Sequence, residues 1–204
     1  LVNLDSLAPN RLFAEGARSG LIQIDGVGEL RELRSEVKAD VSRLDHRLTG
    51  SLGTAYCEIK GVTLERDAVA LFPDAPTLRG LKHVEELITL RGRGYAAAAV
   101  FLIQMEGVRC FTPNTGAQPE FHRALCRARE AGVQLLAWSE LTLYEYQGRW
   151  SLKEAAADRQ FWGVRGDLEK LALGSGGSWV IKEKKPASRY VPVCGLFDFG
   201  VILR

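Results

Sequence analysis

The sequence lacks the signals of several common protein classes. No apolar run reaches the length of about 18 residues that a membrane helix needs, so no membrane segment is expected. No signal peptide is recognisable, and the chain starts at Leu1 rather than Met, as a fragment would. Cysteine is scarce: Cys57, Cys110, Cys126 and Cys194 form no C-x-x-C pair and have no neighbouring histidine pair. This argues against a zinc site and favours reduced thiols in a cytoplasmic protein.

An excess of one charge is also missing. The chain carries 27 Lys and Arg residues against 25 Asp and Glu residues, and its net charge is +2. That balance is too mild to indicate a nucleic-acid partner by itself. The hydrophobic fraction of 46% and the charged fraction of 25% are typical of a soluble globular chain that builds a core. The length of 204 residues predicts one domain or two small ones.

Hydrophobic periodicity predicts an α/β fold. Helices are expected over residues 9–20, 77–91 and 120–131. Strands are expected over residues 68–72, 95–103 and 133–138. The last two are nearly continuous apolar runs, as expected of strands covered on both faces. Asn10 is the expected N-cap of the first helix. The order helix, strand, helix, strand predicts a partly parallel sheet.

The run Tyr56-Cys57-Glu58-Ile59-Lys60 is where chemistry is expected. In a strand, alternate side chains point to opposite faces, so Tyr56, Glu58 and Lys60 share one face. Cys57 and Ile59 then point to an apolar face. This pattern also suits a solvated strand face, and the spacing alone leaves that alternative open.

A hairpin is predicted to bring a second carboxylate to Glu58. The run that ends at Asp45 precedes a glycine-containing turn over residues 50–53, so Asp45 and Glu58 can meet across two antiparallel strands. An Asp followed by a strand with Glu-x-Lys is the pattern of the PD-(D/E)xK nuclease-like fold. Two carboxylates can hold Mg²⁺, and Lys60 could orient the attacking water.

The helix expected over residues 77–91 has two faces. Its apolar stripe is made of Leu81, Val84, Leu87 and Ile88. The opposite side is expected to carry the polar residues Arg79, Lys82, His83 and Glu86. Lys82 can pair with Glu86 at i,i+4. These side chains form either a solubilising face or a phosphate-facing surface. His46 and His122 are expected at the surface.

Several stretches form a recognisable set. The longest is Phe72-Pro73-Asp74-Ala75-x-Thr77-x-Arg79-Gly80-x-Lys82-His83-x-x-Glu86-Leu87. The others are Pro9-Asn10-Arg11-Leu12, Ser35-Glu36-Val37-Lys38, Ser42-Arg43-Leu44-Asp45, Glu58-Ile59-Lys60-x-Val62-Thr63-Leu64 and Gly132-Val133-x-x-Leu136-Ala137-Trp138. On these motifs the chain resembles the sugar fermentation stimulation protein (SfsA) family over residues 1 to about 140.

The resemblance implies a fold and a site. The fold is an α/β domain over residues 1–140 with a PD-(D/E)xK restriction-endonuclease-like core, a mixed sheet flanked by helices. The implied partner is DNA, the cofactor Mg²⁺ or Mn²⁺, and the location the cytoplasm. The implied catalytic residues are Asp45, Glu58 and Lys60. The implied metal ligands are Glu36, Asp45 and Glu58, although Glu36 also fits a solvated strand position. The implied DNA contacts are Arg43, Arg79, Lys82 and His83.

The sequence departs from the family pattern in three places. The OB-like N-terminal domain of family members is absent, and Leu1 would fall just past it. His46-Arg47 stand where the family continues with apolar residues, which predicts a weaker strand beside Asp45. Residues 141–204 are an unassigned extension, and the part after about Glu154 has no familiar counterpart. We expect that part to pack poorly on the core, because its run over residues 174–178 is linker-like.

Function then falls into two main classes. The first is a Mg²⁺-dependent nuclease acting on phosphodiesters. The second is a non-enzymatic DNA-binding regulator of sugar (maltose) metabolism genes, which is the family's usual description. A truncated remnant with little function is a third reading. Carboxylates gathered where phosphates lie would repel DNA unless a cation bridged them, which favours the first class.

Overall fold

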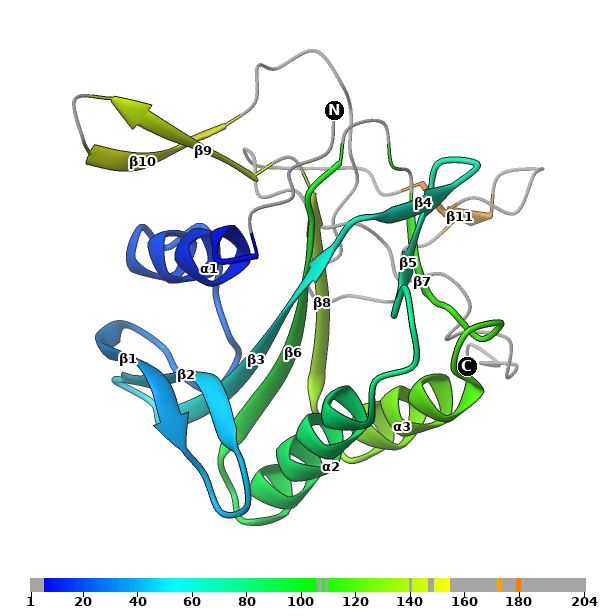
Figure 1. Cartoon of the computed structure of the whole chain (residues 1–204). Coiled ribbons are helices and arrows are strands. Elements are labelled where there is room, and N and C mark those ends of the chain that lie inside the picture. The colour runs from blue at the N-terminus through cyan, green and yellow to red at the C-terminus, as the bar shows by residue number, and fades with distance from the viewer. Residues whose placement is uncertain are drawn as a thin grey trace.

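The computed structural model describes residues 6–105, 108, 110–139, 141–146, 149–154, 172–173 and 179–180. In chain order its helices and strands are α1 (Ala8–Arg18), β1 (Leu30–Lys38), β2 (Arg43–Gly50), β3 (Thr54–Val62), β4 (Leu64–Arg66), β5 (Val69–Phe72), α2 (Leu78–Gly92), β6 (Ala96–Ile103), β7 (Cys110–Pro113), α3 (Pro119–Glu130), β8 (Gln134–Ser139), β9 (Leu141–Tyr146), β10 (Arg149–Glu154), β11 (Ala172–Leu173) and β12 (Trp179–Val180) (Figure 1).

The main sheet is mixed, as predicted. Its strand order is β1-β2-β3-β6-β8. The first three strands pair antiparallel, whereas β3, β6 and β8 pair parallel. Parallel neighbours need long crossovers, and these contain α2 between β3 and β6 and α3 between β6 and β8. The hairpin β9–β10 lies beside α1 (Figure 1).

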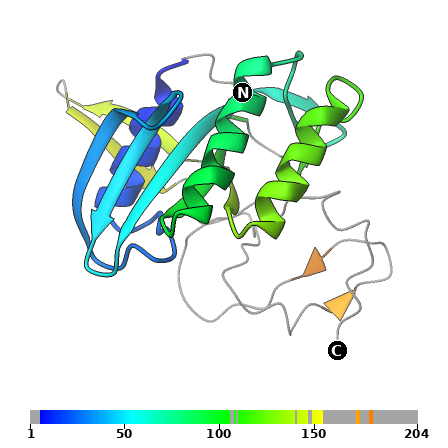
Figure 2. The same cartoon turned by 90° about the horizontal axis from the view of Figure 1, so that it is seen from below.

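Helices cover both faces of this sheet. Helix α1 packs on one face, and α2 and α3 pack side by side on the other (Figures 1 and 2). Strand β6 shows the division residue by residue, because its buried side chains alternate between the two cores. Those on the α2–α3 side are Ala97, Ala99, Phe101 and Ile103. Those on the α1 side are Ala98, Val100 and Leu102. The expectation of a strand buried on both faces is confirmed.

A second, small sheet joins the α2–α3 side. Its order is β4-β5-β7, of which only β5 was expected from the sequence. It brings an aromatic cluster together, since Phe101 of β6 stacks on Phe111 of β7 and contacts Phe72 and Phe121. This sheet therefore closes the core beside the amino-terminal end of α2.

The predicted helices are present, with one correction at a terminus. Helix α1 is capped at Leu7 and not at Asn10, which lies inside its first turn. A proline in the first turn allows this early start, because the first helical N–H groups have no internal partner. Helix α2 begins with a hydrogen bond from the Gly80 amide to the Thr77 hydroxyl, 2.9 Å long.

His46 and Arg47 do not disturb β2, contrary to expectation. The His46 side chain is buried rather than exposed, and its ring stacks on Phe13 of α1 at 5.1 Å between centroids. Burial lowers the pKa of His46 to about 4, so the ring is neutral at pH 7 and packs like an aromatic residue. Arg47 forms an ion pair of 3.2 Å with Glu32 on the neighbouring strand. His122, also expected at the surface, is half-buried.

Some predictions fall outside the described residues. The expectation that the chain packs poorly after Glu154 is among them, apart from the short strands β11 and β12. Within the described part, no helix is long and apolar enough to span a membrane.

Phe101 should dominate the stability of the α2–α3 core. Replacing it with Ala leaves a cavity among three other phenylalanines, so the free energy of unfolding should fall by about 3–5 kcal/mol. The matched control is Leu52→Ala at an exposed turn, which should change the free energy of unfolding by less than about 0.5 kcal/mol. Urea unfolding measures both. Equal effects of the two substitutions would contradict the packing described above.

Candidate functional site

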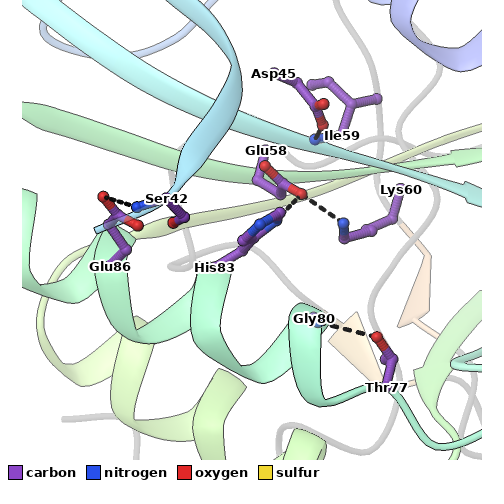
Figure 3. A network of polar contacts seen from close by, with 9 residues as sticks. All are labelled: Ser42, Asp45, Glu58, Ile59, Lys60, Thr77, Gly80, His83 and Glu86. Atoms are coloured by element: carbon purple, nitrogen blue, oxygen red, sulfur yellow. Dashed lines mark hydrogen bonds and ion pairs between the residues drawn. The ribbon is translucent and has the colours of Figure 1, made fainter. Parts of the chain in front are cut away.

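The site lies where β2 and β3 separate. Their antiparallel pairing runs from Thr49 and Thr54 to His46 and Cys57, and then stops. Beyond that point β2 stays paired with β1, and β3 stays paired with β6. The amide of Ile59 thereby loses its backbone partner. The carboxylate of Asp45 replaces it, with Oδ2 accepting from the Ile59 N–H at 2.8 Å (Figure 3).

Glu58 occupies the face of β3 that the alternation predicted. Its side chain is only 3% exposed. Its Oε1 accepts from the Lys60 ammonium at 2.5 Å and from Nδ1 of His83, which comes from α2 (Figure 3). Burial raises the pKa of Glu58, but the His83 hydrogen bond and the Lys60 charge more than offset this and hold it below its usual value. Glu58 is therefore a buried carboxylate at neutral pH.

Asp45 experiences the opposite balance. Burial and the negative charge of Glu58 raise the pKa of Asp45, and the Ile59 hydrogen bond with the charges of Lys60 and His83 offsets this only in part. The two carboxylates are thus close enough to repel each other. In addition, Oε2 of Glu58 is buried without a hydrogen-bond partner among the described residues. A bound cation would reduce the repulsion between the two carboxylates and would give Oε2 of Glu58 a partner.

Glu36, the third predicted metal ligand, is placed differently. Its side chain is exposed and forms an ion pair of 3.2 Å with Arg43. It lines, together with Asp45, a cavity of about 440 Å³ between α1 and the β1–β2 hairpin. In the described part of the chain, no three Asp, Glu, His or Cys side chains are arranged to hold a metal ion. The structure brings Asp45 close to Glu58 and places Glu36 beside Asp45 in the cavity, without gathering the three described carboxylates into one metal-holding group.

The predicted apolar stripe of α2 packs on the core, but the buried face of the helix is wider than predicted. His83 and Glu86 were expected on the outer side, and both are buried. Lys82 does not pair with Glu86; its ammonium donates to the carbonyl of Val41 at 2.9 Å. The buried His83 ring lies against Glu58, so its placement does not support the predicted DNA contact. Arg79 and Lys82 are exposed, as predicted.

The part that His83 plays in this site was not recognised from the sequence. A signal was present, because Gly80, His83, Val84 and Leu87 recur at the i, i+3, i+4, i+7 spacing of one helix face. The glycine leaves room on that face: a Cβ at Gly80 would lie 2.7 Å from the Thr77 methyl carbon and 3.3 Å from Phe121.

The motifs and the fold agree with one protein family. The family model described as "Sugar fermentation stimulation protein RE domain" matches residues 7–142. The chain belongs to the sugar fermentation stimulation protein family. Two curated homologues of that name, from Caldanaerobacter subterraneus subsp. tengcongensis and Desulfitobacterium hafniense (strain Y51), are each 43% identical, over 139 and 137 residues. These matches cover 68% and 67% of this chain and 60% and 58% of the homologues.

A solved structure supports the same assignment. The structure of Pyrococcus furiosus SfsA in complex with Ca²⁺ is 28% identical and superposes with a TM-score of 0.64. The match covers 75% of this chain and 64% of that one. It confirms the predicted fold class, an α/β restriction-endonuclease-like core with a mixed sheet between helices. This chain of the SfsA family spans about three fifths of the length of the curated relatives that it matches.

Asp45→Asn should stabilise the metal-free protein. A carboxyl group whose pKa is raised by folding stabilises the fold at low pH and loses that contribution as pH rises through the folded-state pKa. At pH 7 the ionised Asp45 therefore lowers stability, and Asn removes the charge while keeping an acceptor for Ile59. Urea unfolding in chelator should show a gain of about 0.5–2 kcal/mol. Asp45→Ala, which loses the acceptor too, should be less stable than Asp45→Asn; a destabilised Asn variant would refute the repulsion.

Proposed function

We propose that this domain carries a divalent-cation site that acts on phosphodiesters of DNA. The observation that carries the proposal is the pairing of Asp45 with the buried Glu58 where β2 and β3 separate, beside Lys60. Two carboxylates and a lysine in this arrangement suit metal-assisted hydrolysis, because a phosphodiester brings further negative charge to a place that is already acidic.

The donor set fits Mg²⁺ or Mn²⁺. Glu58 would contribute the buried Oε2, which has no partner among the described residues. Asp45 would contribute the carboxylate oxygen that does not accept from Ile59. Mg²⁺ is commonly bound through one or two carboxylates and keeps several waters, so a third protein carboxylate is not required. Glu36, which lines a cavity with Asp45, stays a predicted third ligand.

A solved structure of a relative lends support to a cation site. The Pyrococcus furiosus SfsA structure is a complex with Ca²⁺, a hard cation that prefers oxygen ligands such as the carboxylates of Asp45 and Glu58. When bound, a divalent cation supplies Lewis-acid polarisation of the phosphate and a more acidic water.

The chain's own residues would share the remaining work. Glu58 is buried, but the neighbouring Lys60 is partly exposed. The ammonium of Lys60 can therefore reach a phosphate or a water at the surface. There it would offset negative charge that builds up on the phosphate. His83 holds Oε1 of Glu58, which leaves Oε2 as the oxygen available to a ligand. Arg43, Arg79 and Lys82 are exposed cations that would contact the DNA backbone.

A second candidate function is supported by a specific observation. Glu58 already has two cationic or hydrogen-bonding partners, Lys60 and His83, and its charge is balanced without a metal ion. A domain that only binds DNA, as a regulator of sugar metabolism genes, would need no more than this fold and its exposed cations. Cleavage is the property that separates the two functions.

The first test is a cleavage assay with three proteins. The full chain, Lys60→Ala and Glu58→Ala are incubated with single- and double-stranded DNA in Mg²⁺ or Mn²⁺. Lys60→Ala should bind the metal but cleave about 10²–10³-fold more slowly, because a group that stabilises transition-state charge is lost. Glu58→Ala should lose metal binding and cleavage together. Circular dichroism establishes that both variants are folded.

The outcome also distinguishes the two candidates. If the full chain binds DNA and cuts none with either metal, the nuclease proposal fails. The regulator proposal then takes its place.

The exposed face of α2 makes a separate prediction. If Arg79 contacts a phosphate, Arg79→Gln should weaken DNA binding equally for different sequences. It should also lower the slope of log affinity against log salt by about 0.9. Fluorescence anisotropy between low and high salt measures the slope. Arg123→Gln is the matched control, because Arg123 is an exposed helical arginine on α3 that pairs with Glu120. Equal slopes for the wild type and Arg79→Gln would remove α2 from the DNA interface.

A further inference from the structure

One face of α2 holds both strands that carry the acidic pair. His83 and Glu86 are three residues apart on this helix and are both buried against the sheet. His83 contacts Glu58 of β3. Glu86 reaches the turn between β1 and β2 (Figure 3). The helix therefore bridges two strands that no longer pair with each other at this level.

The contact at the turn is built from charged groups. Oε1 of Glu86 accepts from the amides of Val41 and Ser42, at 3.1 and 3.3 Å. Lys82, on the exposed side of the helix, donates to the carbonyl of Val41 at 2.9 Å. Helix α2 thus binds the backbone of residues 41–42 through both its amide donors and a carbonyl acceptor. Hydrogen bonds to charged groups are stronger than neutral ones, and a buried carboxylate makes them stronger still.

This contact acts on the part of β2 that has no partner in β3, where the buried Leu44 and the ion pair of Asp40 with Arg93 also hold the strand and its turn. Before His46, over residues 43–45, β2 is not paired with β3, and its sheet partner there is β1, which lies at the edge of the main sheet. Asp45 follows Ser42 by three residues. A shift of the turn against α2 would move Asp45 relative to Glu58 and break its hydrogen bond to the Ile59 amide.

We propose that Glu86 is a positioning residue that fixes Asp45 at Glu58 by anchoring the β1–β2 turn to α2. The inference rests on the proposed function in that Asp45 and Glu58 are taken as the cation-binding pair. Glu86 itself touches neither carboxylate nor substrate in this arrangement; it acts through the backbone of residues 41–42.

The direct test needs no metal. Native-state hydrogen exchange of the Ile59 amide in the metal-free full chain reports whether Asp45 is in place. Glu86→Ala should speed this exchange by about tenfold or more, because the turn loses a charged acceptor. The amide of Val100 in the buried β6 should be unchanged. Glu85→Ala is the matched control, since Glu85 is the adjacent, exposed residue and pairs with Arg127 on α3; it should leave Ile59 unchanged.

The proposal is overturned if folded Glu86→Ala leaves the Ile59 exchange rate as in the wild type, or if Glu85→Ala speeds it equally. Should Glu86→Ala fail to fold, Glu86→Gln replaces it, because Gln keeps the size and loses the charge. In that case, faster hydrogen exchange of the Ile59 amide in Glu86→Gln would support the proposal. An unchanged exchange rate would overturn it.

A second readout uses Mn²⁺ alone. Residues that orient a metal ligand typically change metal affinity by about 10–100-fold, so Glu86→Ala should weaken Mn²⁺ binding by that factor. In an Asp45→Asn background the same substitution should have no further effect, because Asp45 is no longer available to be positioned. An equal loss in both backgrounds would mean a merely structural role and would overturn the proposal. If the wild type binds no Mn²⁺, the proposed function fails, while the exchange of Ile59 still decides the role of Glu86.

Discussion

One interrupted backbone pairing governs this site. Because the pairing of β2 with β3 ends at His46 and Cys57, the amide of Ile59 needs a new acceptor, and the carboxylate of Asp45, just before His46, supplies it. That single hydrogen bond brings a second acid to the buried Glu58. The same separation leaves the first residues of β2 paired with β1 alone, and α2 contacts β3 through His83 and the β1–β2 turn through Glu86.

The two acids are held in unequal states. Glu58 is buried but balanced by Lys60 and His83, whereas folding disfavours the charge of Asp45. Such uncompensated charge costs stability and is retained at many functional sites, where a ligand offsets the cost. The negative charge of Asp45, which lowers the stability of the fold, is thus the charge that the proposed cation would offset.

Much of this was predictable from the sequence because strands and helices have fixed periods. The alternation of Tyr56, Glu58 and Lys60 predicted their shared face, and the apolar run of β6 predicted a strand buried on both sides. The apolar stripe of α2 was predicted correctly, but His83 and Glu86, assigned to solvent by their polarity, are buried beside it. Tertiary partners decide that choice: Glu58 and the amides of residues 41–42 satisfy these side chains in the interior. The burial of His46 against Phe13 was hidden for the same reason.

The central claim is that Asp45 and Glu58 form a cation site for a polyanionic ligand. Calorimetric titration of Mn²⁺ into the full chain, without and with a short DNA duplex, tests it most directly. The account predicts saturable binding that is tighter when DNA is present, because the metal and the phosphates favour each other's binding. It also predicts that Glu58→Ala abolishes this binding. Absence of Mn²⁺ binding under both conditions, or binding that Glu58→Ala leaves unchanged, would contradict the account.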